Sequence, residues 1–222
     1  MLSFSDLECL CELKGIQNCS GIVLAGGKGT RLGHSKPHVR LGSMSLIEHV
    51  IDAALTLFDE VLLVVGKDAD LFSVIQKQHP LLTIISDDQE GIGPMMGMYT
   101  GMKRLTTEYS LVLPCDAPFV SVPLMRALIG LARGSDAAIP IWPNKNVEPL
   151  HSVYRVSPSI QAIKSALNCG EKSVLDMIKR LEKINFVPVD SLRKFDSELH
   201  TFFNVNYSED LKTAYEIQSV SE

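Results

Sequence analysis

A glycine-rich segment with cationic side chains is the part of this sequence that points most directly to chemistry. The segment LAGGKGTRLGHSK follows a short apolar run and contains four glycines, Gly26, Gly27, Gly29 and Gly33. Such a loop can direct several backbone N–H groups at phosphate oxygens. Arg31 and Lys36 add positive charge where a triphosphate would lie. The pattern indicates a phosphate-binding loop, with a flexible turn carrying solvated cations as the alternative.

The glycine spacing excludes two common nucleotide motifs. No window matches the P-loop pattern G-x-x-x-x-G-K-[ST]. Counting from Gly27 and Gly29, the dinucleotide fingerprint requires a third glycine where the chain has Leu32. The ribose-binding acid of a dehydrogenase would follow a second strand, whereas Glu48 and Asp52 belong to a predicted helix. The spacing therefore argues against an NAD-dependent oxidoreductase.

Two acidic positions follow predicted strands. Asp116 comes just after the apolar run YSLVLP, and Asp87 follows LLTII. Ligands bind at the carboxyl ends of the strands in open α/β sheets, and a carboxylate there can hold Mg²⁺ against phosphate oxygens. We expect Asp116 to bind the metal and Asp87 to lie near the nucleotide sugar or the metal. The alternatives are a turn residue at Asp116 and a solvated helix cap at Asp87.

Two asparagines near the carboxyl terminus extend this set. Asn204 and Asn206 lie in TFFNVN (201–206), which we predict to be a strand, so that both amides would share one face. Two turn-favouring residues that close the strand are the alternative. Ser208 is predicted to cap a closing helix that starts with SEDLKTAYEI.

Apolar runs and helical patterns alternate along the chain, which favours a mainly parallel sheet covered on both faces. One α/β domain is predicted over 21–222, preceded by an amino-terminal extension over 1–20. Expected strands cover 21–25, 60–66, 81–85, 109–114, 137–141, 184–189 and 201–206. Expected helices cover 45–58, 68–78, 94–105, 122–133, 158–168 and 172–182, before the closing helix.

Composition narrows the function classes. The net charge is −5 and no basic tract stands out, so neither nucleic acid nor a membrane is an expected partner. No apolar run approaches the roughly 20 residues that span a bilayer. The first residues carry acidic side chains instead of the basic start of a secretory signal, so a cytoplasmic protein is expected.

Five motifs together resemble the molybdenum cofactor guanylyltransferases. They are LAGGKGTRLGHSK, ISDDQEGIGPMMGM, PCDAPF, PLHSVYR and FFNVNYSEDL, in the same order as in that family. The first and third recur among many nucleotidyltransferases, whereas PCDAPF together with NVN points to this group. The resemblance implies a Rossmann-like nucleotidyltransferase fold with one reversed strand and helices on both faces. It implies transfer of GMP from GTP to a molybdopterin-type phosphate, with release of pyrophosphate.

The resemblance also implies roles for individual residues. Arg31, Lys36 and Asp116 would be catalytic, with Asp116 on Mg²⁺ as the required cofactor. Asn204 and Asn206 would contact the acceptor. Weak contacts with proteins that make or receive the cofactor are further implied. The nucleotide-binding residues would be Leu24, Ala25, Gly26, Gly27, Gly29, Lys36, Asp87 and Asp116.

One position departs from the family pattern. A base-reading asparagine is expected at the end of the second strand, where this chain has Val64, Val65 and Gly66. A cytidylyltransferase for the same cofactor, or a sugar-phosphate or other small-phosphate nucleotidyltransferase, therefore stays open. A non-enzymatic nucleotide-binding regulatory module is a further alternative, and the presence of both Lys36 and Asp116 weighs against it.

Overall fold

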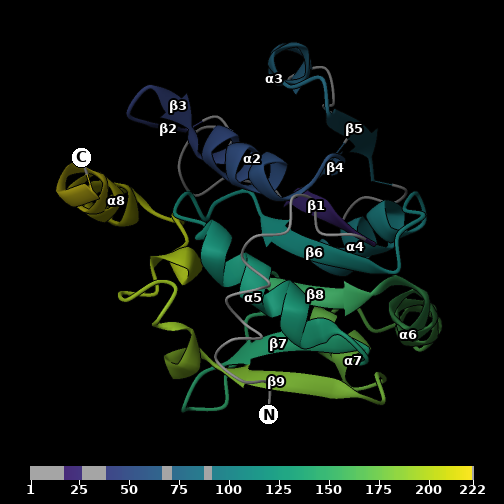
Figure 1. Ribbon diagram of the computed structural model, residues 1–222. Coiled ribbons are helices and arrows are strands. Elements are labelled where there is room, and N and C mark those ends of the chain that lie inside the picture. The colour runs from purple at the N-terminus through teal and green to yellow at the C-terminus, as the bar shows by residue number, and fades with distance from the viewer. Residues whose placement is uncertain (1–17, 27–38, 67–71, 88–91, 222) are drawn as a thin grey trace.

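The computed structural model of this chain describes residues 18–26, 39–66, 72–87 and 92–221. Within these ranges seven strands form one sheet, and two further strands form a small hairpin (Figure 1). The strands of the sheet are β1 (Cys19–Ala25), β4 (Val61–Val65), β5 (Leu82–Ser86), β6 (Tyr109–Pro114), β7 (Ala137–Ile141), β8 (Ser152–Arg155) and β9 (Ile184–Pro188). The hairpin consists of β2 (Arg40–Leu41) and β3 (Met44–Ser45). Residues 1–17 lie outside the described ranges, so the amino-terminal extension stays a prediction.

The sheet is parallel except at one strand. Its order is β5-β4-β1-β6-β8-β7-β9, and β8 runs antiparallel to both of its neighbours. The predicted α/β fold with one reversed strand is therefore confirmed. The reversed strand lies in the stretch 142–155, for which the sequence pattern predicted no element. The strand follows a proline-containing turn and has only four residues. A strand of this length is too short for a recognisable alternation of apolar and polar residues.

Helices cover both faces of the sheet, as predicted (Figure 1). One face carries α2 (Leu46–Leu57) and α5 (Val122–Ala132). The other face carries α4 (Pro94–Met102), α6 (Val156–Asn168) and α7 (Val174–Ile178). The remaining helices are α3 (Ser73–Gln78), α8 (Ser208–Ser221) and the 3₁₀ turns η4 (Val189–Leu192) and η5 (His200–Phe202). In the part of the chain that the structure describes, no helix combines the length and apolarity needed to cross a bilayer.

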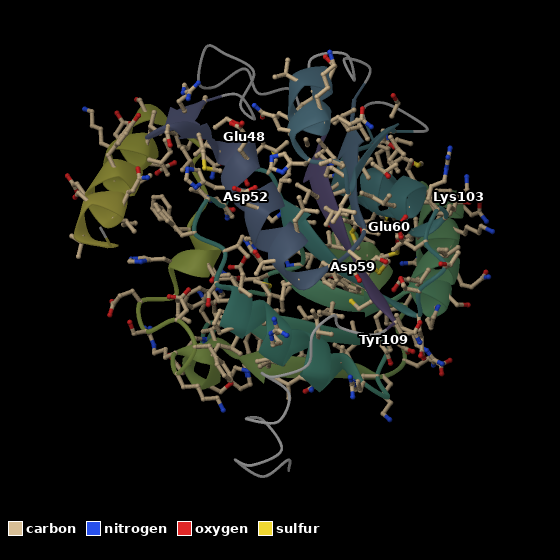
Figure 2. The ribbon with its side chains drawn as sticks, turned by 45° about the horizontal axis from the view of Figure 1, so that its top comes forward. Glu48, Asp52, Asp59, Glu60, Lys103 and Tyr109 are labelled. Carbon is tan, nitrogen blue, oxygen red and sulfur yellow. The ribbon has the colours of Figure 1, made fainter. Side chains whose placement is uncertain are left out.

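Helix α2 follows the predicted apolar stripe closely. It begins after Ser45, whose backbone N–H donates a 2.6 Å hydrogen bond to the Glu48 carboxylate in a capping box. Residues such as Ile47 and Ile51 are fully buried against the sheet. Figure 2 shows Glu48 and Asp52 on this helix. The sequence predicted that Asp52 lies on a helix, and the structure confirms it. Asp52 is therefore not the acid that follows a second strand in a dinucleotide-binding site.

Helix α4 approaches the sheet closely because it carries glycines at two positions four residues apart. A Cβ added to Gly101 would lie 3.0 Å from Cδ1 of Ile22, and one added to Gly97 would lie 3.1 Å from Cδ2 of Leu24. The methionines of α4 fill the space around this contact, and Met95 and Met98 are fully buried. Helix α4 is thereby held against β1 and β4, the strands that carry the glycine-rich loop and the expected base-reading position.

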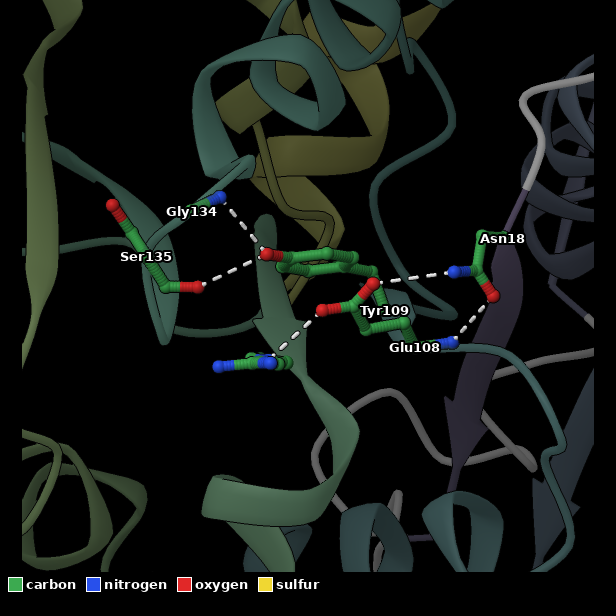
Figure 3. A network of polar contacts seen from close by, with 6 residues as sticks. Asn18, Glu108, Tyr109, Gly134 and Ser135 are labelled. Carbon is green, nitrogen blue, oxygen red and sulfur yellow. Dashed lines mark hydrogen bonds and ion pairs between the residues drawn. The ribbon is translucent and has the colours of Figure 1, made fainter.

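A polar network joins several strands at the edge of the sheet where the parallel strands β1 and β6 begin (Figure 3). The side chain of Asn18 accepts a 3.0 Å hydrogen bond from the Glu108 backbone N–H and donates a 3.2 Å bond to its carboxylate. The same carboxylate binds Nε of Arg155 at 3.0 Å. The hydroxyl of Tyr109 accepts a bond from the N–H of Gly134. These contacts fix the starts of β1 and β6 relative to the end of β8.

The predicted strand over 201–206 is wrong. The segment forms η5 and then an extended stretch without strand pairing. Strand β6, the nearest possible partner, already has β1 and β8 as neighbours, so the segment cannot join the sheet there. The predicted Ser208 cap is also wrong, because α8 already includes Ser208. The carboxylate of Asp210 accepts hydrogen bonds from the backbone N–H groups of Asn206 and Tyr207 instead.

Candidate active site

The carboxyl ends of four neighbouring strands lie in register at one edge of the sheet. Ala25 of β1 pairs with Val65 of β4, and Val65 pairs with Ser86 of β5. On the other side of β1, Leu24 pairs with Pro114 of β6. Because these strands are parallel, the residues that follow them emerge side by side. The first glycine of the loop and both predicted acidic positions therefore share one edge.

Backbone hydrogen bonds continue the strand pairing beyond the strands themselves. The N–H of Asp87 donates to the carbonyl of Val65 at 2.7 Å, and the N–H of Cys115 donates to the carbonyl of Leu24 at 3.1 Å. The segment that carries Asp87 is thus fixed to β4, and the segment that carries Asp116 is fixed to β1, the strand from which the glycine-rich loop leaves. Rigid strand ends of this kind can hold functional side chains at constant positions.

Asp87 is half-buried against helix α4. Its Oδ1 accepts a 2.9 Å hydrogen bond from the hydroxyl of Thr100. A Cβ added to Gly97 would lie 3.9 Å from Oδ2 of Asp87, so the helix leaves room for this carboxylate. The helix begins at Pro94 after Gly93, whose φ of 92° suits glycine, and both features were predicted from the sequence.

Asp116 lies in the turn after β6 and contacts the carboxyl-terminal segment. The N–H of Val205 donates a 2.8 Å hydrogen bond to the backbone carbonyl of Asp116. Val205 stands between Asn204 and Asn206, so both asparagines flank the residue that meets the Asp116 turn. The structure therefore brings the third and fifth motifs together, although they are nearly ninety positions apart in the sequence.

The two asparagines do not share the face of a strand. The amide of Asn204 donates to the carbonyl of Phe202 at 3.4 Å, and the amide of Asn206 donates to the carbonyl of Asn204 at 3.4 Å. Oδ1 of Asn204 is buried and has no hydrogen-bond partner among the described residues. A buried amide oxygen without a partner is costly, and a bound cation or ligand donor would satisfy it.

Part of the predicted phosphate loop lies outside the described residues. Gly27, Gly29, Arg31 and Lys36 belong to this part, so their roles stay predictions. Of the residues before it, Leu24 is buried, Ala25 is half-buried and Gly26 is exposed. The side chain of Leu24 packs in the core on the α4 side of the sheet, and its carbonyl accepts the hydrogen bond from Cys115, so neither group is directed at a ligand.

The expected base-reading position has no polar side chain. Val64 and Val65 are both buried in the sheet, with exposures of 1% and 0%, so neither side chain can reach a ligand at the edge. Gly66 follows them and is half-buried. Among the described residues, no atom lies within 4 Å of a Cβ added at Gly66. A base bound here would meet backbone groups of the chain.

The oxygen donors at this edge suit a hard cation. Within the described ranges no three His, Cys, Asp or Glu side chains cluster as a metal site. An ion beside Asp116 would therefore take carboxylate and amide oxygens from the protein and further oxygens from a substrate. Mg²⁺ is commonly held in this way, by one or two carboxylates together with phosphates. The carboxylate of Asp116 fits this ion.

Several residues of the site had no assigned role from the sequence. Thr100 could not be linked to Asp87, because the distance between helix and strand end depends on the two glycines of α4. Thr201 is fully buried, and its hydroxyl accepts a 2.9 Å hydrogen bond from the N–H of Ser121 in the loop that follows the Asp116 turn. His151 lies in the PLHSVYR motif, and Glu148 directly precedes it. From the sequence, this motif contributed only to the family resemblance.

Comparison with known proteins agrees with this geometry. The family model described as the MobA-like NTP transferase domain matches residues 21–184. A probable molybdenum cofactor guanylyltransferase of Methanosarcina mazei is 35% identical over 87% of this chain and 88% of its own length. A protein of the same description from Methanothermobacter thermautotrophicus is 32% identical, over 86% of this chain and 95% of its own length.

Solved structures show the same relationship. Molybdopterin-guanine dinucleotide biosynthesis protein A from Archaeoglobus fulgidus superposes with a TM-score of 0.77 at 30% identity, covering 90% of this chain and 99% of that protein. The 2-C-methyl-D-erythritol 4-phosphate cytidylyltransferase of Thermus thermophilus shares the fold, with a TM-score of 0.67 at 16% identity over 89% of this chain and 98% of that protein. Sequence, fold and site agree that this chain is a nucleotidyltransferase and belongs to the MobA-like NTP transferase family.

Proposed function

We propose that this nucleotidyltransferase transfers GMP from GTP to the terminal phosphate of a molybdopterin-type cofactor in the cytoplasm. The observation that carries the proposal is the alignment of Gly26, Asp87 and Asp116 at one sheet edge, with Asn204 and Asn206 beside Asp116. The relatives described as molybdenum cofactor guanylyltransferases match over most of the chain, which supports the choice of donor and acceptor.

The reaction requires positioning and charge neutralisation more than covalent help from the protein. An oxygen of the acceptor phosphate attacks the α-phosphorus of GTP and forms a new P–O bond. The bond between the α-phosphorus and the bridging oxygen breaks, and pyrophosphate leaves with that electron pair. Backbone N–H groups of the glycine-rich loop, with Arg31 and Lys36, would stabilise the phosphate charges.

Asp116 would hold Mg²⁺, Asp87 would contact the nucleotide, and Asn204 and Asn206 would contact the acceptor. When bound, the ion would neutralise charge on the phosphates and hold donor and acceptor together. Two hydrogen bonds hold these acidic residues in place. Thr100 orients the Asp87 carboxylate through its 2.9 Å hydrogen bond, and Val205 holds the Asp116 turn through the 2.8 Å bond to its carbonyl.

Transfer of CMP is the second candidate, because no side-chain amide at Val64, Val65 or Gly66 is available to read guanine. Pyrophosphate release measured with GTP, CTP, ATP and UTP, each with molybdopterin and Mg²⁺, separates these possibilities. We expect release with GTP. Release with CTP alone would show that the donor is CTP instead of GTP. No release with any of the four nucleotides would reject the proposed function.

A further inference from the structure

Phe202 is enclosed by two aromatic side chains from the loop before β8. The rings of Trp142 and His151 both meet it edge-to-face, with centroids 5.8 Å and 5.4 Å away. The indole N–H of Trp142 donates a 2.6 Å hydrogen bond to Oε1 of Glu148. The other carboxylate oxygen of Glu148 lies 3.8 Å from Nδ1 of His151. This loop starts the reversed strand β8, so it lies at the same sheet edge as Asp116.

His151 is buried without a hydrogen bond on either ring nitrogen. Its side chain is 1% exposed, and the charged group recorded beside it is the carboxylate of Glu148. The buried Oδ1 of Asn204 also lacks a partner, and the amide of Asn204 donates to the carbonyl of Phe202. Buried polar atoms in this state require an explanation, and function is a common one. Both residues contact Phe202.

The segment from Phe202 to Val205 is held from two directions. On one side, the hydroxyl of Thr201 accepts from the N–H of Ser121, and the N–H of Val205 donates to the Asp116 carbonyl. On the other side, the loop that contains His151 contacts the ring of Phe202. Asn204 lies between these two attachments in the sequence, and its amide donates to the backbone carbonyl of Phe202.

We propose that Glu148 and His151 are positioning residues that orient Asn204 for the acceptor. This inference rests on the proposed function for the identity of the acceptor. The Glu148 carboxylate is held in place by Trp142 and sets the imidazole of His151 by charge and dipole at 3.8 Å. The imidazole in turn packs against the ring of Phe202, and the backbone carbonyl of the same residue accepts the hydrogen bond from the amide of Asn204.

A packing role and a positioning role predict opposite results for His151→Phe. The phenyl ring has a similar size and removes two buried polar atoms that lack partners, so packing alone predicts unchanged or higher stability with full activity. A positioning role predicts that the variant is as stable as the wild-type protein but binds and uses the acceptor less well. We expect Tm to be maintained and the acceptor KM to rise about 10-fold, with the KM for GTP changed less than about 2-fold.

The kinetic comparison includes two further variants. His151→Asn keeps a donor near the position of Nδ1, so partial recovery of acceptor use is expected. Ser159→Ala is the matched control, because Oγ of Ser159 is also buried without a partner but lies in α6. Wild-type acceptor kinetics in His151→Phe, with an active wild-type enzyme, would overturn the inference.

A measurement without substrate tests the same inference independently. The side-chain amide resonances of Asn204, assigned with Asn204→Asp, should shift in Glu148→Gln, which leaves all aromatic rings in place. They should not shift in Glu108→Gln, the same change at the opposite sheet edge. An unchanged Asn204 amide in Glu148→Gln would overturn the inference. If the wild-type enzyme releases no pyrophosphate with any nucleotide, the proposed function fails. In that case the amide shift alone decides whether Glu148 and His151 position Asn204.

Discussion

The backbone N–H of Val205 donates a 2.8 Å hydrogen bond to the carbonyl of Asp116. This bond joins the carboxyl-terminal NVN segment to the turn after β6, at the edge where the glycine-rich loop leaves β1. Two motifs that are far apart in the sequence thereby form one site. The proposed site depends on this contact, because it brings the segment that contains Asn204 and Asn206 to the turn that contains Asp116.

Replacement of Thr100 by valine should weaken nucleotide binding. The change keeps the side-chain shape but removes the 2.9 Å hydrogen bond to Asp87, so the carboxylate loses one of the contacts that orient it. We expect the KM for GTP to rise and the free energy of unfolding to fall by about 1 kcal/mol. Thr56→Val on α2, whose hydroxyl bonds only within its own helix, is the control. An unchanged KM for GTP would contradict the role of Asp87.

A side-chain amide introduced at Gly66 should increase selectivity for guanine. Gly66 lies at the sheet edge, and no described atom lies within 4 Å of an added Cβ, so the side chain has room. Gly66→Asn should raise the ratio of kcat/KM for GTP over CTP by about 10-fold, since a polar group that pairs with the base discriminates strongly. Gly66→Ala controls for loss of the glycine. Equal ratios in both variants would show that the base binds elsewhere.

Gly101→Ala should destabilise the protein although alanine favours helices. The new Cβ would lie 3.0 Å from Cδ1 of Ile22, so either this side chain or α4 would have to shift. We expect a loss of about 1–3 kcal/mol in the free energy of unfolding, as for other overpacked cores. Ile22→Val removes the opposing carbon, so the double variant should lose less than the sum of the two single losses. Additive losses would exclude this contact as the cause.

The contribution of Glu48 to stability should depend on pH. Partial burial disfavours its ionised form, but hydrogen bonds from Ser45 and the charge of Arg40 outweigh it and lower the pKa of Glu48 below its ordinary value. Its stabilising effect should therefore be present at neutral pH and be lost as the pH falls through the lowered pKa. Glu48→Gln should cost about 0.5 kcal/mol at neutral pH, reduced by solvent screening, and nothing in acid.

Urea unfolding at about pH 7 and about pH 3 measures this difference. Asp59→Asn, an exposed carboxylate just beyond the same helix, is the matched charge control. A Glu48→Gln effect of equal size at both pH values would contradict a lowered pKa.

The sequence predicts most of the fold because strong local patterns coincide with tertiary burial. The apolar stripe of α2 and the continuous apolar run of β6 were predicted correctly. The stripe of α2 is buried against the sheet, and β6 is buried within it. Strand β8 was not predicted, because four residues carry too little periodicity. Residues 201–206 alternate as a strand would, but a strand also needs a free edge with which to pair, and local sequence does not contain that information.

The candidate site was predictable where a residue directly follows a strand. Asp87 and Asp116 meet this condition, so their shared edge follows from parallel pairing alone. The asparagines reach the same edge by a route through η5 that no spacing rule describes. Thr100, Glu148 and His151 depend on how closely helix and loop pack, which is decided by contacts between distant segments.

Pyrophosphate release by Asp116→Asn, with GTP, molybdopterin and Mg²⁺, tests the central claim most directly. This variant keeps the shape of the side chain and the backbone carbonyl that binds Val205, so the fold should be retained. We expect kcat to fall by about 100-fold or more, because the metal and the phosphates lose a charged ligand. A folded Asp116→Asn variant with wild-type turnover would contradict the assignment of this strand end as the active site.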